Sequence, residues 1–485
     1  MPLPVISVAQ MREWEKATWA TGQTEGEVIR RVGKKIARRA RKLTRSGDVI
    51  LILAGKGHNG DDARAAAEHL ENRRVQVMDV TKPEAALAEF QRRTGVAPAS
   101  VSSDKNGDRL EAGPTLIIDG LFGIGLNRSL DEAWIKFITA VNDTKIPVLS
   151  VDVPSGLNTD TGETFGAAIE AAITLTVGAP KTGMLAPAAW PFVGRLEIVE
   201  NVGLVPCPLA GEINWTQPSD FDDYPPRRAV AGHKGSFGHL AIVAGSLGFH
   251  GAAVLATRAA HRAQPGLVTL FTQENVYHPV AAQLQAAMVQ VWQPGLRFPD
   301  SVSAVFFGPG LAAPDLPEEL KTAFRRLWRD SPLPLVADAS ALDWLSSQPF
   351  PRDAIRVITP HPGEAARLLN STAQQVQADR PRALRELSRR YGSWVVLKGH
   401  QTLIGRADGK ILVNPSGNPH LAQGGSGDTL GGFIAGLLAQ PALHADVGKI
   451  ICYAVWQHSA AADALQSKRA NWVVEDLVNE IGNAR

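Results

Sequence analysis

The segment Gly424-Gly425-Ser426-Gly427-Asp428 is the strongest candidate for chemistry in this sequence. It precedes the apolar run Leu430–Leu438, which predicts a helix that begins near the segment. Backbone N–H groups at a helix start, together with the helix dipole, stabilise phosphoryl charge. An aspartate at that place can take a proton from an attacking hydroxyl group. A helix cap behind a glycine turn is the alternative, but we favour phosphoryl transfer because other segments agree with it.

Four further segments place glycine or polar residues where an apolar run ends. They are His233–Gly238, Gly308–Gly310, Thr359–Glu364 and Lys398–Thr402. Lys398 follows a predicted buried strand and could neutralise nucleotide phosphate, with an ordinary exposed lysine as the alternative. His361 lies between two prolines, which hold it rigidly enough to orient a substrate, although a lone histidine is often structural.

The first half carries three comparable strand ends. Val49–Ala54 runs into the glycine-rich segment Gly55–Asp62, and two later apolar runs end in Asp119 and Asp152, each followed within a few residues by glycine. A glycine-rich turn from strand to helix leaves N–H groups free to bind phosphate. Ligands of open α/β sheets bind outside the carboxyl ends of the strands. Helix capping alone is the alternative, but three such ends in one domain favour a binding site.

These segments are positioned by apolar strand-length runs that alternate with helix-length segments in both halves, which predicts parallel sheets covered on both faces. The first half is predicted to contain strands Val49–Ala54, Val75–Val80, Thr115–Asp119, Val148–Val151 and Ile173–Val177, a helical stretch over Ser7–Leu43, and helices Asp62–Leu70 and Leu130–Val141. The second half is predicted to contain strands His239–Ala244, Leu267–Phe271, Ala304–Phe307, Leu335–Ala337, Arg356–Thr359, Trp394–Leu397 and Lys410–Val413, and helices Ala252–Ala263, Glu364–Leu369, Pro381–Arg390 and Asp428–Leu438.

A proline-rich strip between Pro206 and Pro226 separates the two halves. Because proline opposes regular pairing, we predict a linker there. The chain of 485 residues is long enough for two cores, and we predict domains over residues 1–215 and 222–485.

The composition excludes several classes of protein. Lys+Arg number 50 and Asp+Glu number 48, so the net charge of +2 argues against a nucleic-acid partner. Two cysteines exclude a disulfide framework and a cysteine-based zinc site. The sequence has neither a signal-peptide pattern nor an apolar run of about 20 residues. We therefore expect a cytoplasmic protein with no membrane partner.

The three strand ends of the first half resemble the motifs of NAD(P)H-hydrate epimerases, over about Ile6 to Val205. That family interconverts the R and S forms of hydrated NADH and NADPH and uses a bound potassium ion. The resemblance implies a Rossmann-like three-layer α/β/α domain, in which Asp152 contacts the nicotinamide hydrate and acts as the acid/base residue. It implies potassium ligands Asn59, Asp119 and Ser155. It also implies substrate contacts from His58, Asn59, Gly60, Asp61, Asp62, Gly123, Ile124, Gly125, Leu126, Asn127, Arg128, Ser129 and Asp152.

The first of these motifs departs from the family pattern, which is close to G-x-G-N-N-G-G-D-G. His58 replaces an asparagine, and Asp61 and Ala63 replace glycines. The side chain and negative charge of Asp61 are expected to hinder the close approach of phosphate and so to weaken epimerase activity.

The second half resembles the ADP- or ATP-dependent NAD(P)H-hydrate dehydratases of the ribokinase-like superfamily, over about Asp222 to Val478. Both halves in this order resemble the bifunctional NAD(P)H-hydrate repair enzymes. The resemblance implies that Asp428 deprotonates the C6 hydroxyl of the S hydrate. The oxygen then takes a phosphoryl group from ADP (or ATP), and loss of phosphate restores the nicotinamide ring.

The same resemblance assigns contacts in the second half. The hydrate is held by Ala252, Gly310, His361 and Asp428. The nucleotide is held by Lys398, Gly399, His400, Gln401, Thr402, Gly425, Ser426 and Gly427, with Mg²⁺ bridging its phosphates. We also expect a homo-oligomer. The alternative function is a ribokinase-like small-molecule kinase fused to a non-catalytic Rossmann-like binding module.

Overall fold

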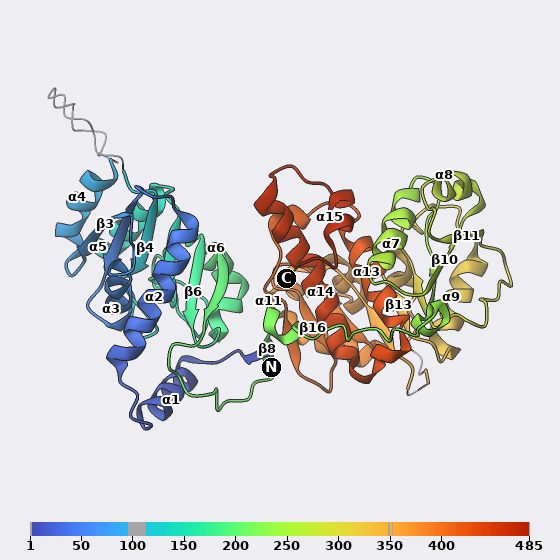
Figure 1. Ribbon diagram of the computed structural model, residues 1–485, viewed down its shortest axis with the longest axis horizontal. Coiled ribbons are helices and arrows are strands. Elements are labelled where there is room, and N and C mark those ends of the chain that lie inside the picture. The colour runs from blue at the N-terminus through green and yellow to red at the C-terminus, as the bar shows by residue number, and fades with distance from the viewer. Residues whose placement is uncertain (1, 96–112, 348–349, 352, 485) are drawn as a thin grey trace. The chain divides into compact units, whose positions relative to one another are not determined.

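The computed structural model describes residues 2–95, 113–347, 350–351 and 353–484. The chain forms two compact units, Leu3–Gly211 and Glu212–Arg485, each with its own sheet and core (Figure 1).

The first unit contains a parallel sheet in the strand order β3-β2-β4-β5-β6-β7. Its strands are β2 (Val49–Ala54), β3 (Arg74–Asp79), β4 (Leu116–Gly120), β5 (Val148–Val151), β6 (Ile173–Val177) and β7 (Arg195–Val199), and the short β1 (Leu3–Pro4) precedes them in the chain. Strands β2, β4, β5 and β6 are buried along their whole length. Such strands need cover on both faces of the sheet.

Helices supply this cover. They are α1 (Val8–Trp19), α2 (Glu25–Leu43), α3 (His58–Ala67), α4 (Pro83–Thr94), α5 (Glu132–Asp143) and α6 (Trp190–Val193). On one face, Ile36 of α2 and Ala63 of α3 join a core with Ile50 and Ile52. On the other face, α4 and α5 contribute Phe90 and Phe137, whose ring centroids lie 5.5 Å apart. The predicted three-layer α/β/α architecture is thus confirmed.

The sheet of the second unit runs in the order β8-β17-β16-β15-β14-β13-β12-β9-β10-β11. The strands are β8 (Ile213–Trp215), β9 (His239–Val243), β10 (Leu267–Thr272), β11 (Met288–Val291), β12 (Ala304–Phe307), β13 (Leu335–Ala337), β14 (Arg356–Ile358), β15 (Trp394–Leu397), β16 (Leu403–Gly405) and β17 (Ile411–Val413). Strand β16 is antiparallel to β15 and β17, and the other pairings are parallel.

The helices of this unit are α7 (His250–Arg262), α8 (Tyr277–Ala281), α9 (Glu318–Asp330), α10 (Pro362–Leu369), α11 (Ala373–Ala378), α12 (Arg380–Tyr391), α13 (Ser426–Leu438), α14 (Val447–Lys468) and α15 (Val474–Glu480). Helix α13 is almost wholly buried and packs against α7 and α14 in the main core. Its Gly432 allows this approach, because a Cβ there would lie 2.1 Å from the carbonyl oxygen of Ala256 in α7.

The division between the two units falls at Gly211–Glu212, within the proline-rich strip predicted as a linker, but part of this strip forms a strand. Residues Ile213–Trp215 form β8, which pairs in parallel with β17 of the second sheet. The prolines at 206, 208, 218, 225 and 226 lie outside these three residues, so the backbone N–H groups of β8 remain available for pairing.

None of the helices in the described ranges is both long enough and apolar enough to cross a membrane.

Candidate active sites in the two units

In the first unit, the structure brings together Asn59, Asp119 and Ser155, which lie at or after the carboxyl ends of β2, β4 and β5. The buried Asp119 carboxylate accepts hydrogen bonds from the Ser155 hydroxyl at 2.6 Å and the Ser155 N–H at 2.9 Å. Ser155 Oγ also accepts from the Phe122 N–H at 2.8 Å, and Asn59 Nδ2 donates to the Phe122 carbonyl at 2.9 Å. All three side chains therefore contact one another or the same backbone residue.

This cluster is rich in oxygen atoms of the kind that bind a hard cation. Burial raises the pKa of Asp119, although hydrogen bonds from Ser155 and Ser150 oppose the shift. Amide, carboxylate, hydroxyl and carbonyl oxygens are the ligands that hard cations take. Gly123 lets the two loops approach, because a Cβ there would lie 3.2 Å from Cβ of Asn59. A cation here would compensate a buried carboxylate.

Asp152 is held in place by a buried lysine that the sequence analysis did not identify. Its Oδ1 accepts from the Lys181 ammonium at 2.5 Å, from the Val177 N–H at 3.0 Å and from the Thr176 hydroxyl at 3.1 Å. Lys181 is fully buried, and Asp152 adopts a left-handed backbone with φ of +58°. Strained backbone at a non-glycine residue is frequent in active sites. The signal in the sequence was a lysine directly after a buried apolar run.

Other acidic groups surround Asp152. Burial, followed by the charges of Asp152, Asp61 and Glu15, raises the pKa of Asp62 to about 8. Burial and Asp152 also raise the pKa of Glu15, which lies on α1 and was not predicted. At neutral pH the site therefore presents a protonated carboxyl group, Asp62, beside the Asp152–Lys181 ion pair.

The charge of Asp61 is paired. Arg64, one helical turn later in α3, contacts Asp61 Oδ1 at 2.9 Å and Asp79 Oδ1 at 2.7 Å, and donates to the Gly55 carbonyl at 2.7 Å. This pairing reduces the electrostatic hindrance to phosphate that the sequence analysis expected. The remaining predicted loop, Gly123–Ser129, follows β4 and is half-buried at Gly123 but exposed by Asn127.

In the second unit, Asp428 lies in the first turn of α13, directly after the left-handed Gly425 and Ser426-Gly427. Burial, followed by the charge of Asp338, raises its pKa to about 6, while the Lys398 ammonium opposes the shift. A carboxyl group that titrates near neutral pH suits a general base.

Lys398 is not an ordinary exposed lysine. Its Nζ lies 2.8 Å from Asp338 Oδ1 and 3.8 Å from Glu364 Oε2. Burial alone would lower its pKa, but the neighbouring carboxylates outweigh burial and raise it. A Cβ added at Gly427 would lie 3.2 Å from this Nζ, so the ammonium is at the start of α13. Asp338, which the sequence analysis missed, follows β13 directly, as Asp152 follows β5.

His361 caps helix α10. The ring Nδ1 of His361 accepts hydrogen bonds from the backbone N–H groups of Gly363 at 3.0 Å and Glu364 at 3.3 Å. The backbone N–H of His361 donates to Glu364 Oε2 at 2.8 Å. The half-exposed ring has Nε2 3.5 Å from Glu364 Oε1. The capping role is thus present, and the outer ring nitrogen is the atom available to a substrate. Through Glu364, His361 is linked to Lys398.

Two more predicted residues lie side by side. Gly310 has φ of +62°, and a Cβ there would lie 2.9 Å from Cβ of Ala252 in the first turn of α7.

Behind α13, His458 of α14 was not predicted. Its Nε2 lies 3.0 Å from the Ser426 carbonyl, and burial lowers its pKa to about 4, so the ring is neutral and donates to that carbonyl.

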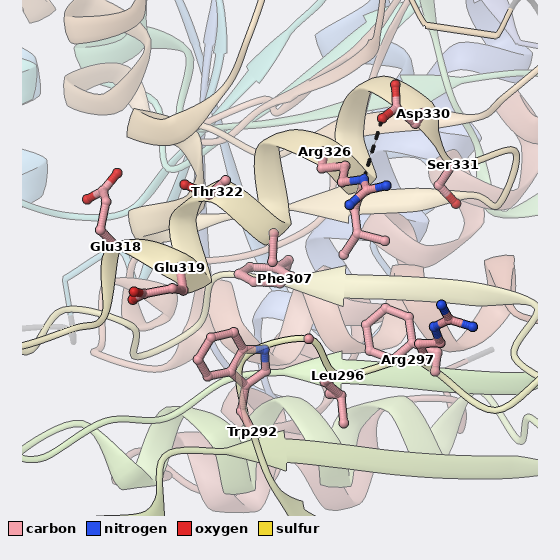
Figure 2. A pocket seen from close by; sticks show the side chains of 14 residues that line it. Trp292, Leu296, Arg297, Phe307, Glu318, Glu319, Thr322, Arg326, Asp330 and Ser331 are labelled. Atoms are coloured by element: carbon pink, nitrogen blue, oxygen red, sulfur yellow. Dashed lines mark ion pairs between the residues drawn. The ribbon is translucent and has the colours of Figure 1, made fainter.

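A cavity of about 830 Å³ lies apart from these residues, between α9 and the segment that follows β11 (Figure 2). Its described lining residues include Trp292, Phe307 and Arg326 but none of those predicted to do chemistry. Across the described ranges, no cluster of three or more His, Cys, Asp or Glu side chains could hold a metal ion.

Comparison with known proteins covers both units. The family model for NAD(P)H-hydrate dehydratase matches residues 240–483, and the model for the YjeF-related protein N-terminus matches residues 25–183. The bifunctional NAD(P)H-hydrate repair enzyme of Coxiella burnetii is 33% identical over 94% of this chain and 93% of its own. That of Gloeobacter violaceus is 34% identical over 96% of this chain and 94% of its own. A solved structure of the ADP/ATP-dependent NAD(P)H-hydrate dehydratase of Bacillus subtilis is 30% identical, with a TM-score of 0.49 over 53% of this chain and 92% of that one.

Proposed function

The chain belongs to the family of bifunctional NAD(P)H-hydrate repair enzymes, and on this premise we propose that it epimerises R and S NAD(P)H hydrates and dehydrates the S form. The second reaction consumes ADP (or ATP). The observation that carries the proposal is the placement of Asp428 at the start of α13 beside Lys398 and Asp338, with a pKa of about 6.

In the dehydratase site, Asp428 takes the proton from the C6 hydroxyl of the hydrate, and the oxygen attacks the terminal phosphorus of ADP. AMP leaves, and the hydroxyl has become a phosphate ester. Elimination of the phosphate together with a proton from the neighbouring ring carbon, which passes to solvent, then restores the double bond of the nicotinamide ring. The backbone of Gly425–Gly427 and the helix dipole stabilise the charge of the transferred group. Ala252, Gly310 and the outer nitrogen of His361 hold the hydrate.

The nucleotide is held by the loop Lys398–Thr402, with the Lys398 ammonium directed to the start of α13. Mg²⁺ supplies further positive charge to the phosphates when bound. The side chains present fit an ion that the nucleotide itself brings, since Mg²⁺ is commonly held by phosphates and one or two carboxylates rather than by a protein cage.

In the epimerase site, Asn59, Asp119, Ser155 and the Phe122 carbonyl would hold potassium, which supplies positive charge beside the hydrate. Asp152, oriented by Lys181, serves as the base, and the protonated Asp62 is placed to serve as the acid. Two carboxyl groups whose environments keep them in opposite protonation states are the usual sign of an acid/base pair. The loops His58–Asp62 and Gly123–Ser129 hold the substrate.

The test is recovery of NADH from a mixture of R and S NADH hydrates with ADP, Mg²⁺ and K⁺, followed by absorbance against a control without enzyme. Complete, ADP-dependent recovery that Asp428→Ala abolishes would support both activities. Recovery that stops at the S fraction would show that the chain lacks epimerase activity. Accumulation of a stable phosphoester would show that the second unit is a kinase rather than a dehydratase. ATP is run in parallel to decide between the two nucleotides.

The same proposal includes a cytoplasmic homo-oligomer that takes NADH and NADPH hydrates and ADP (or ATP) as its small-molecule partners. Light scattering coupled to size-exclusion chromatography tests the oligomeric state, and cell fractionation tests the location.

A further inference from the structure

Arg380, the first residue of α12, is a buried arginine beneath the loop Lys398–Thr402. Its guanidinium donates to four carbonyl groups. One terminal nitrogen contacts the Leu397 carbonyl at 3.0 Å and the Lys398 carbonyl at 3.3 Å, and the other contacts the carbonyls of His400 and, at 3.3 Å, Gln401. A planar guanidinium can bridge several carbonyls in a fixed geometry, which an ammonium cannot do.

The remaining carbonyls of this segment also have partners on the protein. The Thr402 hydroxyl donates to the Gly399 carbonyl at 2.9 Å, and the Asn414 N–H donates to the Thr402 carbonyl at 2.9 Å. Six consecutive carbonyls, from Leu397 to Thr402, are therefore satisfied by protein groups, four of them by Arg380.

This arrangement determines where the N–H groups point. In a planar trans peptide the N–H is directed opposite to the carbonyl of the same unit. Carbonyls drawn toward Arg380 thus turn the N–H groups of Gly399, Gln401 and Thr402 away from it. Gly399 and Gln401 have φ of +131° and +52°, and successive N–H groups around left-handed residues form concavities that bind anions.

We propose that Arg380 is a positioning residue for nucleotide binding: its guanidinium fixes the backbone N–H groups of the loop Lys398–Thr402 in the orientation that binds the phosphates of a nucleoside diphosphate. The inference rests on the proposed nucleotide site at this loop. Burial lowers the pKa of Arg380 only to about 10, so its charge is present at neutral pH and adds attraction for phosphate from below the loop.

The chain offers a matched control. Arg356 of β14 is equally buried, and its guanidinium also donates to carbonyls of one region, among them those of Trp328 at 2.8 Å and Leu333 at 2.8 Å. It supports the end of α9 rather than the loop that the nucleotide is proposed to contact. Loss of either arginine should lower thermal stability, but only loss of Arg380 should weaken nucleotide binding.

The experiment measures the Kd for ADP by calorimetry, the KM for the hydrate and the unfolding temperature of the full-length wild type, Arg380→Lys, Arg380→Ala, Arg356→Lys and Arg356→Ala. For Arg380→Lys we expect ADP binding at least about 10-fold weaker, because a small misplacement of binding groups has a large effect. The KM for the hydrate should stay within about twofold, and Arg356→Lys should bind ADP as the wild type does. Guanidinium at millimolar concentration should restore ADP binding to Arg380→Ala, whereas methylammonium should not.

Wild-type ADP affinity in Arg380→Lys would overturn the inference while leaving the proposed function in place. Equal weakening in Arg356→Lys would also overturn it, because it would show a general effect of stability. If the wild type bound neither ADP nor ATP, the nucleotide site of the proposed function would fail, and the inference with it. If Arg380→Ala does not fold, the comparison of the two lysine variants decides.

Discussion

Replacement of Asp428 by asparagine should abolish dehydratase activity and yet stabilise the protein at neutral pH. The folded structure raises the pKa of this carboxyl from 3.8 to about 6, chiefly because it is buried. At about 1.4 kcal/mol per unit, ionisation of Asp428 in the folded state costs about 3 kcal/mol. Asparagine removes this cost but loses the favourable interaction of the carboxylate with the start of α13, about 0.3–1 kcal/mol. The free energy of unfolding of Asp428→Asn should therefore exceed that of the wild type by about 2 kcal/mol.

This difference in the free energy of unfolding must depend on pH. Between pH 3.8 and about 6 the folded protein keeps a proton that the unfolded chain releases, so the wild type loses stability as the pH rises through this window. Asparagine does not titrate. The difference between variant and wild type should therefore be small below pH 4, increase up to about pH 6 and stay constant above it. As the pH rises through about 6, kcat/KM of the wild-type dehydratase should increase and then level off, since the base must be ionised.

Thermal and urea denaturation at several pH values measure the difference, and about 2 kcal/mol corresponds to roughly 4–8 °C for a unit of this size. Asp476→Asn is the control, because Asp476 occupies the first turn of α15 with a pKa lowered by a hydrogen bond from the Val473 N–H and by Arg469. That variant should lose stability at pH 8. An Asp428→Asn variant that is less stable than wild type at pH 8, or equally shifted at pH 4 and pH 8, would refute the reasoning.

Three further outcomes are expected. Ser155→Ala removes the hydroxyl that joins the buried carboxylate to the Phe122 backbone, so epimerase activity and its dependence on K⁺ should fall at least about 10-fold while dehydratase activity is kept. Gly427→Ala should raise the KM for ADP, since its Cβ would lie 3.2 Å from an ammonium, whereas Gly424→Ala meets nothing within 4 Å and should not. Arg64→Ala should raise the epimerase KM by leaving Asp61 unpaired, and adding Asp61→Gly should restore it.

The strands were the most predictable part of the fold. Six of them begin and end at the predicted residues: β2, β5, β6, β12, β13 and β15. Each is a largely apolar run that ends directly before a glycine or a charged residue. The expected helix over Ser7–Leu43 is two helices, separated at Gly22, which has φ of +88°. Helix α4 was missed although Pro83 at its first position and the left-handed Gly95 at its end are standard boundary signals. Strand β16 was also missed.

The residues of the two candidate sites also differ in how far the sequence could predict them. Asp119, Asp152 and Asp428 could be predicted because each stands at a strand end or a glycine-rich helix start, and the same rule would have identified Asp338. Lys181 was missed although it follows a buried apolar run. Arg380 could not be predicted, because an arginine is exposed by default and only the folded structure shows it to be buried. Its partners are loop carbonyls, which carry no sequence signal.

Each unit contains a similar lysine–aspartate ion pair in its candidate site. In each, an ammonium group withdrawn from solvent meets an aspartate that follows a parallel strand: Lys181 with Asp152 at 2.5 Å, and Lys398 with Asp338 at 2.8 Å. Buried ion pairs contribute little to stability compared with apolar packing, so stability does not explain them. Each lysine instead fixes the position of one carboxylate in its site. Burial, followed by the charge of that carboxylate, raises the pKa of Asp62 to about 8 and that of Asp428 to about 6. Each site therefore combines a fixed ion pair with a carboxyl group that titrates near neutral pH, which suits acid/base chemistry.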